Sequence, residues 1–246
     1  MFASARANLK ADVAGSYLNW MWWVLEPLGV MVMYAIIFGW LFKNGIDYFP
    51  VFIATGNAIW GLFSKVTTAS TSLMRANETL VSKIYLPKYI LLFVEMLIDG
   101  FKILIEFGLI AVLMLVFRVN ISATILWIIP ILLILVINIY GLGMIMLNLG
   151  VYIDDIGHAM RIIMMVWMYF SGIFYDVRTM IPQPYSGLIL TFNGMAFFID
   201  AFRGALLYSK APNLIGLLAW LGIGIFVSTI GTKIVNKNEN DYVKRM

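Results

Sequence analysis

Long apolar stretches alternate with short polar segments along most of the chain. A helix needs about 20 predominantly apolar residues to cross the hydrocarbon core of a bilayer. The pattern therefore predicts a protein with six transmembrane helices. Their approximate bounds are 20–42, 50–68, 90–117, 121–149, 162–174 and 214–235. Trp20, Trp22 and Trp23 stand at the start of the first span and Trp40 near its end, where aromatic side chains meet the membrane surface.

The residues before the first span form an amphipathic pattern. Apolar side chains recur at steps of three and four residues, at Phe2, Ala5, Leu9, Val13 and Tyr17. The opposite side carries Arg6, Asn8, Lys10 and Asp12. This division predicts a helix over residues 2–19 that lies in the plane of the membrane interface.

Two connecting segments are too polar to cross a membrane. Residues 69–86 keep Leu73, Leu80 and Ile84 within a polar stretch that ends before Pro87, which predicts a short amphipathic helix. Residues 150–161 form a second polar connection, between the fourth and fifth spans.

Residues 185–208 are long enough to cross the membrane, but Asn193-Gly194 interrupts them and Asp200 and Arg203 follow. If this segment enters the membrane from the outer side and returns to the same side, 11 basic residues lie on the cytoplasmic side and 5 outside. If it crosses, the counts become 8 and 7. Because basic residues concentrate on the cytoplasmic side, we favour a re-entrant pair of short helices, with both termini cytoplasmic.

Composition supports one transmembrane domain over residues 1–246. The chain is 62% hydrophobic and 12% charged, whereas soluble domains average about 25% charged residues. It has no cysteine and one histidine, which excludes disulfides, thiolate chemistry and a multi-histidine metal centre. No phosphate-binding loop of the GxxxxGK[ST] type occurs, so the chain is not expected to bind ATP in that way. The net charge of +4 is no indication of nucleic-acid binding.

Charged residues inside the third span are the first candidates for chemistry. Glu95, Asp99, Lys102 and Glu106 share one helical face. Such residues usually face a bundle interior or water. We favour a set of ion pairs that fixes helix packing, while a proton path through Asp99 or Glu106 is the alternative.

Two spans carry dense aromatic faces. Trp23, Tyr34 and Phe38 share a face of the first span with Pro27 and Val30. Trp167, Phe170 and Phe174 share a face of the fifth span, with Tyr169 beside them. Aromatic rings offer flat apolar surfaces to sugars, and Tyr and Trp add a polar group, although such faces also serve packing and lipid contact.

These elements together resemble the membrane subunit of type-2 ABC exporters, in the branch that exports O-antigen, teichoic acid or capsule. The resemblance covers nearly the whole chain. It rests on LNWMWWVLEPLGVMVMYAIIFG at 18–39, MRANETLVSKIYLPKYI at 74–90, YIDDIGHAMRIIMMVWMYFSGIFY at 152–175 and FNGMAFFIDAFRGALLY at 192–208. The branch commonly has Asn-Pro where this chain has Asn193-Gly194.

The resemblance implies a half-transporter in a bacterial or archaeal cytoplasmic membrane. Two copies would form the pore, and two ATP-binding cassette subunits would bind ATP and Mg²⁺ on the cytoplasmic side. Residues 69–86 would be the coupling helix, and residues 150–161 a second contact. The candidate contacts with the ATPase are Arg75, Asn77, Glu78, Lys83, Asp154, Asp155 and Arg161.

The same resemblance implies a substrate and a route. The substrate would be a polyprenyl-pyrophosphate-linked glycan whose head group first meets Arg6 and Lys10. The glycan would then pass along the aromatic residues Trp23, Tyr34, Phe38, Trp167, Tyr169, Phe170 and Phe174, and the re-entrant helices at 185–208 would gate its exit.

Three alternatives stay open at this point. The first is a type-2 ABC permease that exports drugs or lipids. The second is an ion-coupled carrier that uses the charges of the third span and has no ATPase partner. The third is a membrane-bound glycosyltransferase in which Asp154 and Asp155 hold a metal-nucleotide, although two adjacent acids also serve as helix-capping residues.

Overall fold

The computed structural model describes residues 5, 19–34, 36–37, 45–83 and 86–245, which contain helices and connecting segments and no strand. The all-helical class predicted from the sequence is confirmed for these residues. The helices are η1 (Asn19–Met21), α2 (Trp22–Tyr34), α3 (Phe49–Ser70), α4 (Leu73–Ala76), α5 (Glu78–Lys83), α6 (Tyr89–Val116), η3 (Ala123–Trp127), α7 (Ile128–Tyr152), α8 (Ile156–Phe170), α9 (Val177–Met180), α10 (Tyr185–Phe192), α11 (Gly194–Leu207) and α12 (Leu214–Arg245). The predicted interfacial helix, residues 2–19, lies outside the described residues apart from its positions 5 and 19.

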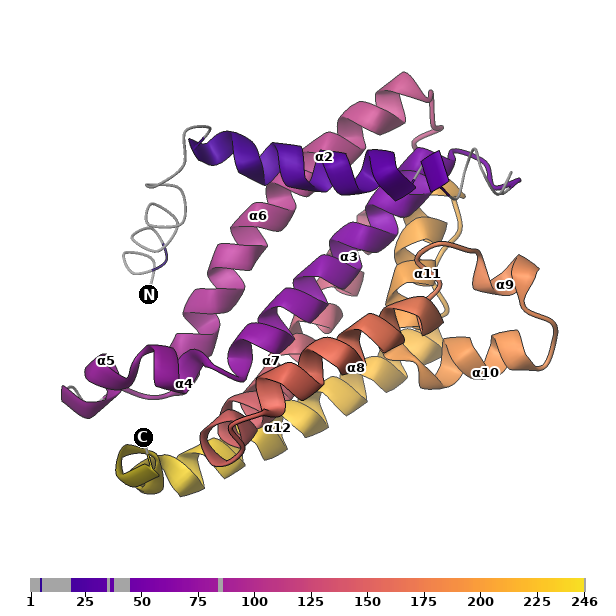
Figure 1. The fold of residues 1–246 in the computed structure, drawn as a ribbon. Coiled ribbons are helices and arrows are strands. Elements are labelled where there is room, and N and C mark those ends of the chain that lie inside the picture. The colour runs from indigo at the N-terminus through magenta and orange to yellow at the C-terminus, as the bar shows by residue number, and fades with distance from the viewer. Residues whose placement is uncertain (1–4, 6–18, 35, 38–44, 84–85, 246) are drawn as a thin grey trace.

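Helix α3 lies at the centre of the bundle. It contacts α2, α6, α7, α8 and α11, and α2 crosses over α3 and α6 (Figure 1). Most of its side chains are buried, among them Phe52, Ile53, Ile59 and Val66. The hydrophobic core is therefore built around this helix.

Helices α7 and α12 run in the same direction along most of their length. Asn138 of α7 donates to the carbonyl of Trp220 at 3.1 Å, and two turns or more further on Asn148 accepts from Asn238 at 2.9 Å. Gly141 permits the close approach, because a Cβ there would lie 2.6 Å from the backbone nitrogen of Ser228. Small residues at such contacts are typical of helix pairs in membranes.

Two stretches among the described residues are long and apolar enough to cross a membrane. They are Ala123–Tyr152, with a mean hydropathy of 2.6, and Leu214–Glu239, with 2.1. Their outward side chains are exposed and apolar, including Leu133, Ile215 and Phe226. Because large exposed apolar surfaces mark contact with a membrane or partner, these helices have the surface of lipid-facing elements.

The segment predicted to be re-entrant is a bent helix pair. Helices α10 and α11 meet at 98° around Asn193. The side chain of Asn193 accepts from the backbone nitrogens of Met195 and Ala196 and so caps α11. A Cβ at Gly194 would lie 2.8 Å from the ring of Trp220, so a residue without a side chain fits here.

The fifth predicted span differs from the observed helix at both ends. Helix α8 begins at Ile156, so only residues 153–155 separate it from α7, and the predicted connection at 150–161 is too long. The helix ends at Phe170 rather than Phe174, because Gly172 has a φ of +69°, which favours glycine.

Two further predicted boundaries are corrected. The segment 69–86 is not one helix: α3 continues to Ser70, and two short helices follow, α4 and α5. The last helix does not end near Val235 but continues to Arg245, since Tyr242 is fully buried and anchors the polar turns.

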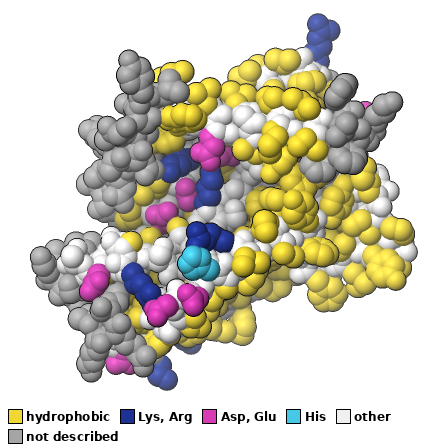
Figure 2. Space-filling view, in the orientation of Figure 1, with side chains coloured by type: hydrophobic (Ala, Val, Ile, Leu, Met, Phe, Trp, Pro, Cys, Tyr) yellow, Lys and Arg dark blue, Asp and Glu magenta, His cyan; other side chains and the backbone are white. Residues whose placement is uncertain are grey.

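The two ends of the bundle carry different elements. Helices α4 and α5 and the C-terminal end of α12 lie at one end, which we call the α4–α5 end, and α9, α10 and α11 lie at the other (Figure 1). Figure 2 shows charged side chains between α2 and α8 and near α4 and α5, whereas the surface towards α10 is mostly hydrophobic.

Candidate functional site

The two segments predicted to contact an ATPase lie side by side at the α4–α5 end. Arg75 of α4 forms an ion pair and hydrogen bond with Asp154, which lies in the three-residue connection between α7 and α8. The backbone also fits closely, because any Cβ at Gly150 would collide with the carbonyl of Thr71. Residues almost 80 positions apart therefore form one continuous surface.

The other predicted contact residues surround this pair. The amide nitrogen of Asn77 donates to the carbonyl of Leu73 at 2.8 Å and so stabilises α4. Arg161 lies 2.8 Å from the ring nitrogen Nδ1 of His158, and both side chains are exposed. Glu78 and Asp155 are exposed, and the side chain of Lys83 lies outside the described residues. The exposed members present mixed charge at the surface of this end.

The C-terminal turns of α12 pack against the same end. The hydroxyl of Tyr242 donates to Oδ1 of Asn148 at 2.8 Å, and Asn238 donates to the same oxygen at 2.9 Å. Lys88, at the start of α6, lies 3.7 Å from Glu239. These contacts join α12 to α7 and to the start of α6, which follows the predicted coupling segment. The sequence pattern did not predict them.

Three of the predicted path residues meet where α2 and α8 end. The ring of Tyr34 lies edge-on to Phe174, with centroids 4.8 Å apart, and Phe174 lies 5.6 Å from Tyr169. Phe174 is buried, whereas Tyr169 and Phe170 are exposed. The structure therefore brings the first and fifth predicted spans together through aromatic contacts.

The two tryptophans of the predicted path contact other helices. Trp23 packs edge-on against Phe101 of α6 at 5.9 Å. Trp167 contacts Phe63 of α3 at 5.2 Å, and its indole nitrogen donates to Asn193 at 3.0 Å. Phe38, Arg6 and Lys10 lie outside the described residues.

An open apolar groove of about 710 Å³ runs between α8 and α10. It is lined by Trp167 and Phe170 on one side and by Leu188 and Phe192 on the other. Phe192 and Phe170 are both largely exposed. The predicted path residues of α8 thus border the bent helix pair of α10 and α11.

The charged face of α6 has a partner that sequence spacing could not show. Glu106 lies 3.9 Å from Lys65 of α3, so the pair links two neighbouring helices. Asp99 is buried. This geometry favours the interpretation that these charges fix helix packing. Among the described residues, no group of His, Cys, Asp or Glu is arranged to hold a metal ion.

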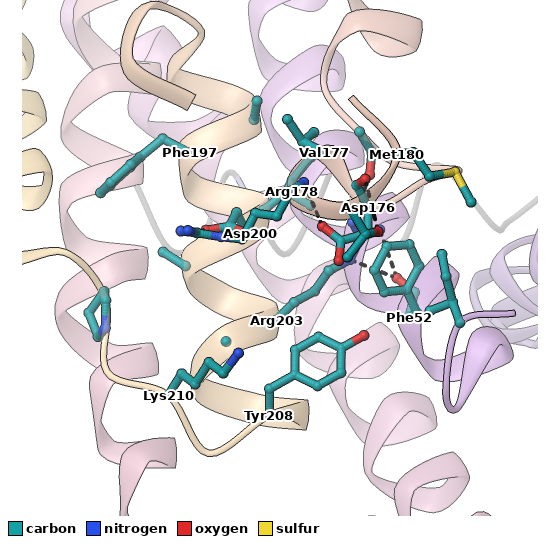
Figure 3. A pocket seen from close by; sticks show the side chains of 18 of the residues that line it. Phe52, Asp176, Val177, Arg178, Met180, Phe197, Asp200, Arg203, Tyr208 and Lys210 are labelled. Atoms are coloured by element: carbon teal, nitrogen blue, oxygen red, sulfur yellow. Dashed lines mark hydrogen bonds and ion pairs between the residues drawn. The ribbon is translucent and has the colours of Figure 1, made fainter. Parts of the chain in front are cut away.

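A cavity of about 700 Å³ lies at the end opposite α4 and α5 (Figure 3). Arg178 of α9 and Asp200 of α11 belong to its lining and form a bidentate ion pair, with N–O distances of 2.8 and 2.7 Å. Asp176 accepts from the backbone nitrogen of Arg178 and caps α9. The hydrogen bonds to Asp200 raise the pKa of Arg178, so its guanidinium stays charged at physiological pH.

The inner wall of this cavity is fixed by Arg203. Its guanidinium donates to the carbonyls of Phe52, Gly172 and Ile173 at 2.6–3.0 Å and lies over the ring of Phe52 at 3.3 Å. These carbonyls belong to α3 and to the segment after α8. Arg203 therefore joins α11 to two elements that are distant in sequence.

The arrangement is that of a polytopic membrane transport subunit, with lipid-facing helices, a polar surface at one end and a bent helix pair at the other. Residues 2–207 match the ABC-2 type transporter family, and the chain belongs to that family. It is therefore a membrane transport component of the ABC-2 class.

Individual relatives extend the likeness over almost the full length. The chain is 28% identical over 231 residues to an O-antigen export system permease protein RfbA of Klebsiella pneumoniae, covering 94% of this chain and 88% of the relative. It is 20% identical over 248 residues to an O-antigen export system permease protein RfbA of Myxococcus xanthus, covering 99% and 94%.

Proposed function

We propose that this chain is the permease subunit of an ATP-driven exporter that moves a lipid-linked polysaccharide of the O-antigen type across the cytoplasmic membrane. The observation that carries this proposal is the similarity to O-antigen export permeases over more than nine-tenths of the chain. Two copies would form the pore, and two ATP-binding cassette subunits would bind ATP and Mg²⁺.

The proposed topology has six spans and cytoplasmic termini. Helices α3 and α6 have 22 and 28 residues, which at about 1.5 Å per residue equals or exceeds a hydrocarbon core of about 30 Å. The parallel course of α7 and α12 supports the re-entrant interpretation, because one crossing between them, α8, leaves α12 to return in the direction of α7. A full crossing by 185–208 would make α12 antiparallel to α7.

In the proposed mechanism, the glycan head group meets Arg6 and Lys10 at the cytoplasmic leaflet. The sugar chain then passes over the aromatic residues of α2 and α8 and leaves past α10 and α11. Stacking on rings suits this movement, since each contact is weak and tolerates any register. ATP binding would move the α4–α5 end, and the Arg75–Asp154 pair would carry that motion into α7 and α8.

Co-purification from the native membrane tests the proposal. We expect an ATPase subunit in equal amount with this chain, and ATP hydrolysis by the complex. Arg75→Asp and Asp154→Arg should each lower the ATPase activity of the complex. The double exchange should restore most of it if the pair acts within the chain.

A matched control is Arg118→Asp, at the opposite end of α6. It should leave the complex and its ATPase activity unchanged. A chain that purifies without any ATPase and moves solute along a proton or sodium gradient would contradict the proposal and favour the ion-coupled alternative.

A further inference from the structure

The cavity between α9 and α11 has no role in the proposed transport cycle. Its volume of about 700 Å³ is within the range of about 300–1,000 Å³ found for small-molecule sites. It opens at the end opposite the α4–α5 surface, beside the bent helix pair. Its position therefore places it where an exported molecule would leave.

The cavity wall is rigid on one side. Arg203 is 5% exposed, and its four hydrogen bonds to carbonyls hold α11 against α3 and the segment after α8. A ligand here would thus meet a preformed wall, which lowers the entropy cost of binding.

The opposite side of the cavity is more open. Helix α9 has only four residues, and the Arg178–Asp200 pair joins it to α11. The side chain of Arg178 is 61% exposed and that of Asp200 24%. This pair is accessible to a ligand at the mouth of the cavity.

The charges that line the cavity balance among the described residues. Three carboxylates, of Asp47, Asp176 and Asp200, face three cations, of Arg178, Arg203 and Lys210. A pyrophosphate or another polyanion would have to approach the carboxylates, and a polycation would have to approach the guanidinium groups. The lining therefore favours a ligand without net charge.

The same groups offer many hydrogen bonds. The carboxylate of Asp200 accepts two hydrogen bonds from Arg178. Because a carboxylate has about four acceptor sites, some of them remain for a ligand. Arg178 uses two of its five N–H groups in that pair. Tyr208 adds a ring and a hydroxyl at the end of α11. Planar side chains with spare donors and acceptors beside an aromatic ring suit the hydroxyl groups and apolar faces of sugars.

We propose that this cavity is an exit-side binding site for an uncharged, hydroxyl-rich segment of the exported glycan, with Arg178 and Asp200 as its polar contacts. The inference rests on the proposed function and adds to it. The neutral sugar chain occupies the site, and the charged lipid head group does not.

Site-specific photocrosslinking in cells that produce the glycan tests this site. The photoreactive amino acid p-benzoylphenylalanine would replace Thr179 at the cavity, Tyr169 on the proposed path, or Phe226 on the outward surface of α12, one at a time. Irradiated chains are purified with their partners and stained for periodate-oxidised sugar. We expect glycan adducts at positions 179 and 169 and none at 226.

The outcomes separate the two proposals. Adducts at position 169 without adducts at 179 would overturn the exit site and leave the proposed function standing. The absence of adducts at both positions, in chains that co-purify with an ATPase, would count against glycan export itself and therefore against both.

Variants that neutralise Arg178 or Asp200 test the polar contacts and leave the buried Arg203 unchanged. Arg178→Gln and Asp200→Asn should each lower the adduct yield at position 179 by about tenfold, since a hydrogen bond to a charged group contributes about 1.5–3 kcal/mol. The yield at position 169 should stay within about twofold in these variants. Arg118→Gln, an exposed arginine outside the cavity, is the matched control and should change neither yield. If the adduct yield at position 179 is unchanged in both cavity variants, the Arg178–Asp200 pair does not contact the glycan.

Discussion

At the scale of single residues, Arg203 shows how a buried charge can serve as a structural link. Taking a guanidinium out of water is costly unless its donors are satisfied. Four hydrogen bonds to three carbonyls, together with the ring of Phe52, offset that cost. Arg203 thereby joins α11, α3 and the segment after α8 at one point.

The first residue-scale prediction concerns Arg203→Met. The change removes the arginine donor from the buried carbonyls of Gly172 and Ile173, whereas the carbonyl of Phe52 still accepts from the hydroxyl of Thr55. Each buried carbonyl left without a donor costs about 1–3 kcal/mol. We expect the unfolding midpoint of the detergent-purified chain to fall by roughly 6 °C or more. Arg118→Met, an exposed position, is the control. A midpoint for Arg203→Met equal to that of the control would show that the carbonyl contacts contribute little.

At the scale of elements, the C-terminal turns of α12 are polar but remain helical and packed. Asn148 accepts from both Asn238 and Tyr242, and burial raises the pKa of the Tyr242 hydroxyl. The Lys88–Glu239 pair adds a link to the start of α6. This element therefore braces the surface that we assign to the ATPase.

The corresponding prediction concerns Asn148→Ala, which leaves the buried hydroxyl of Tyr242 and the half-buried amide of Asn238 without their acceptor. At about 1 kcal/mol for each lost hydrogen bond, the C-terminal turns should open tenfold or more as often. Trypsin should then cleave after Lys237 faster by the same factor, as followed with a C-terminal tag. Asn236→Ala, at an exposed site on the same helix, should leave the rate unchanged. Equal rates for the two variants would mean that Asn148 does not hold these turns.

At the scale of the whole molecule, the apolar stretches were sufficient to predict most helices. Helices α3 and α6 begin and end within two residues of the predicted spans, because hydrophobic length sets both. The start of α8 was missed, since residues 156–161 include His158 and Arg161 and yet are helical. The extension of α12 was missed because it depends on Asn148, about 90 residues away.

Less of the candidate site than of the fold could be predicted from the sequence. The aromatic faces of α2 and α8 were visible from their spacing, and Tyr34 and Phe174 do meet. The contacts of Arg203 could not be predicted from the sequence, because its partners are backbone carbonyls, which every residue has. The Arg75–Asp154 and Lys65–Glu106 pairs join residues that only the helix packing brings together.

Transport in inside-out membrane vesicles that carry the lipid-linked glycan tests the central claim most directly. The measurement is the fraction of glycan protected from an impermeant sugar oxidase added outside. We predict that ATP makes the glycan protected only when this chain and its ATPase partner are both present, and that a proton gradient alone does not. Protection that follows an ion gradient without ATP, or no protection with ATP, would contradict the account.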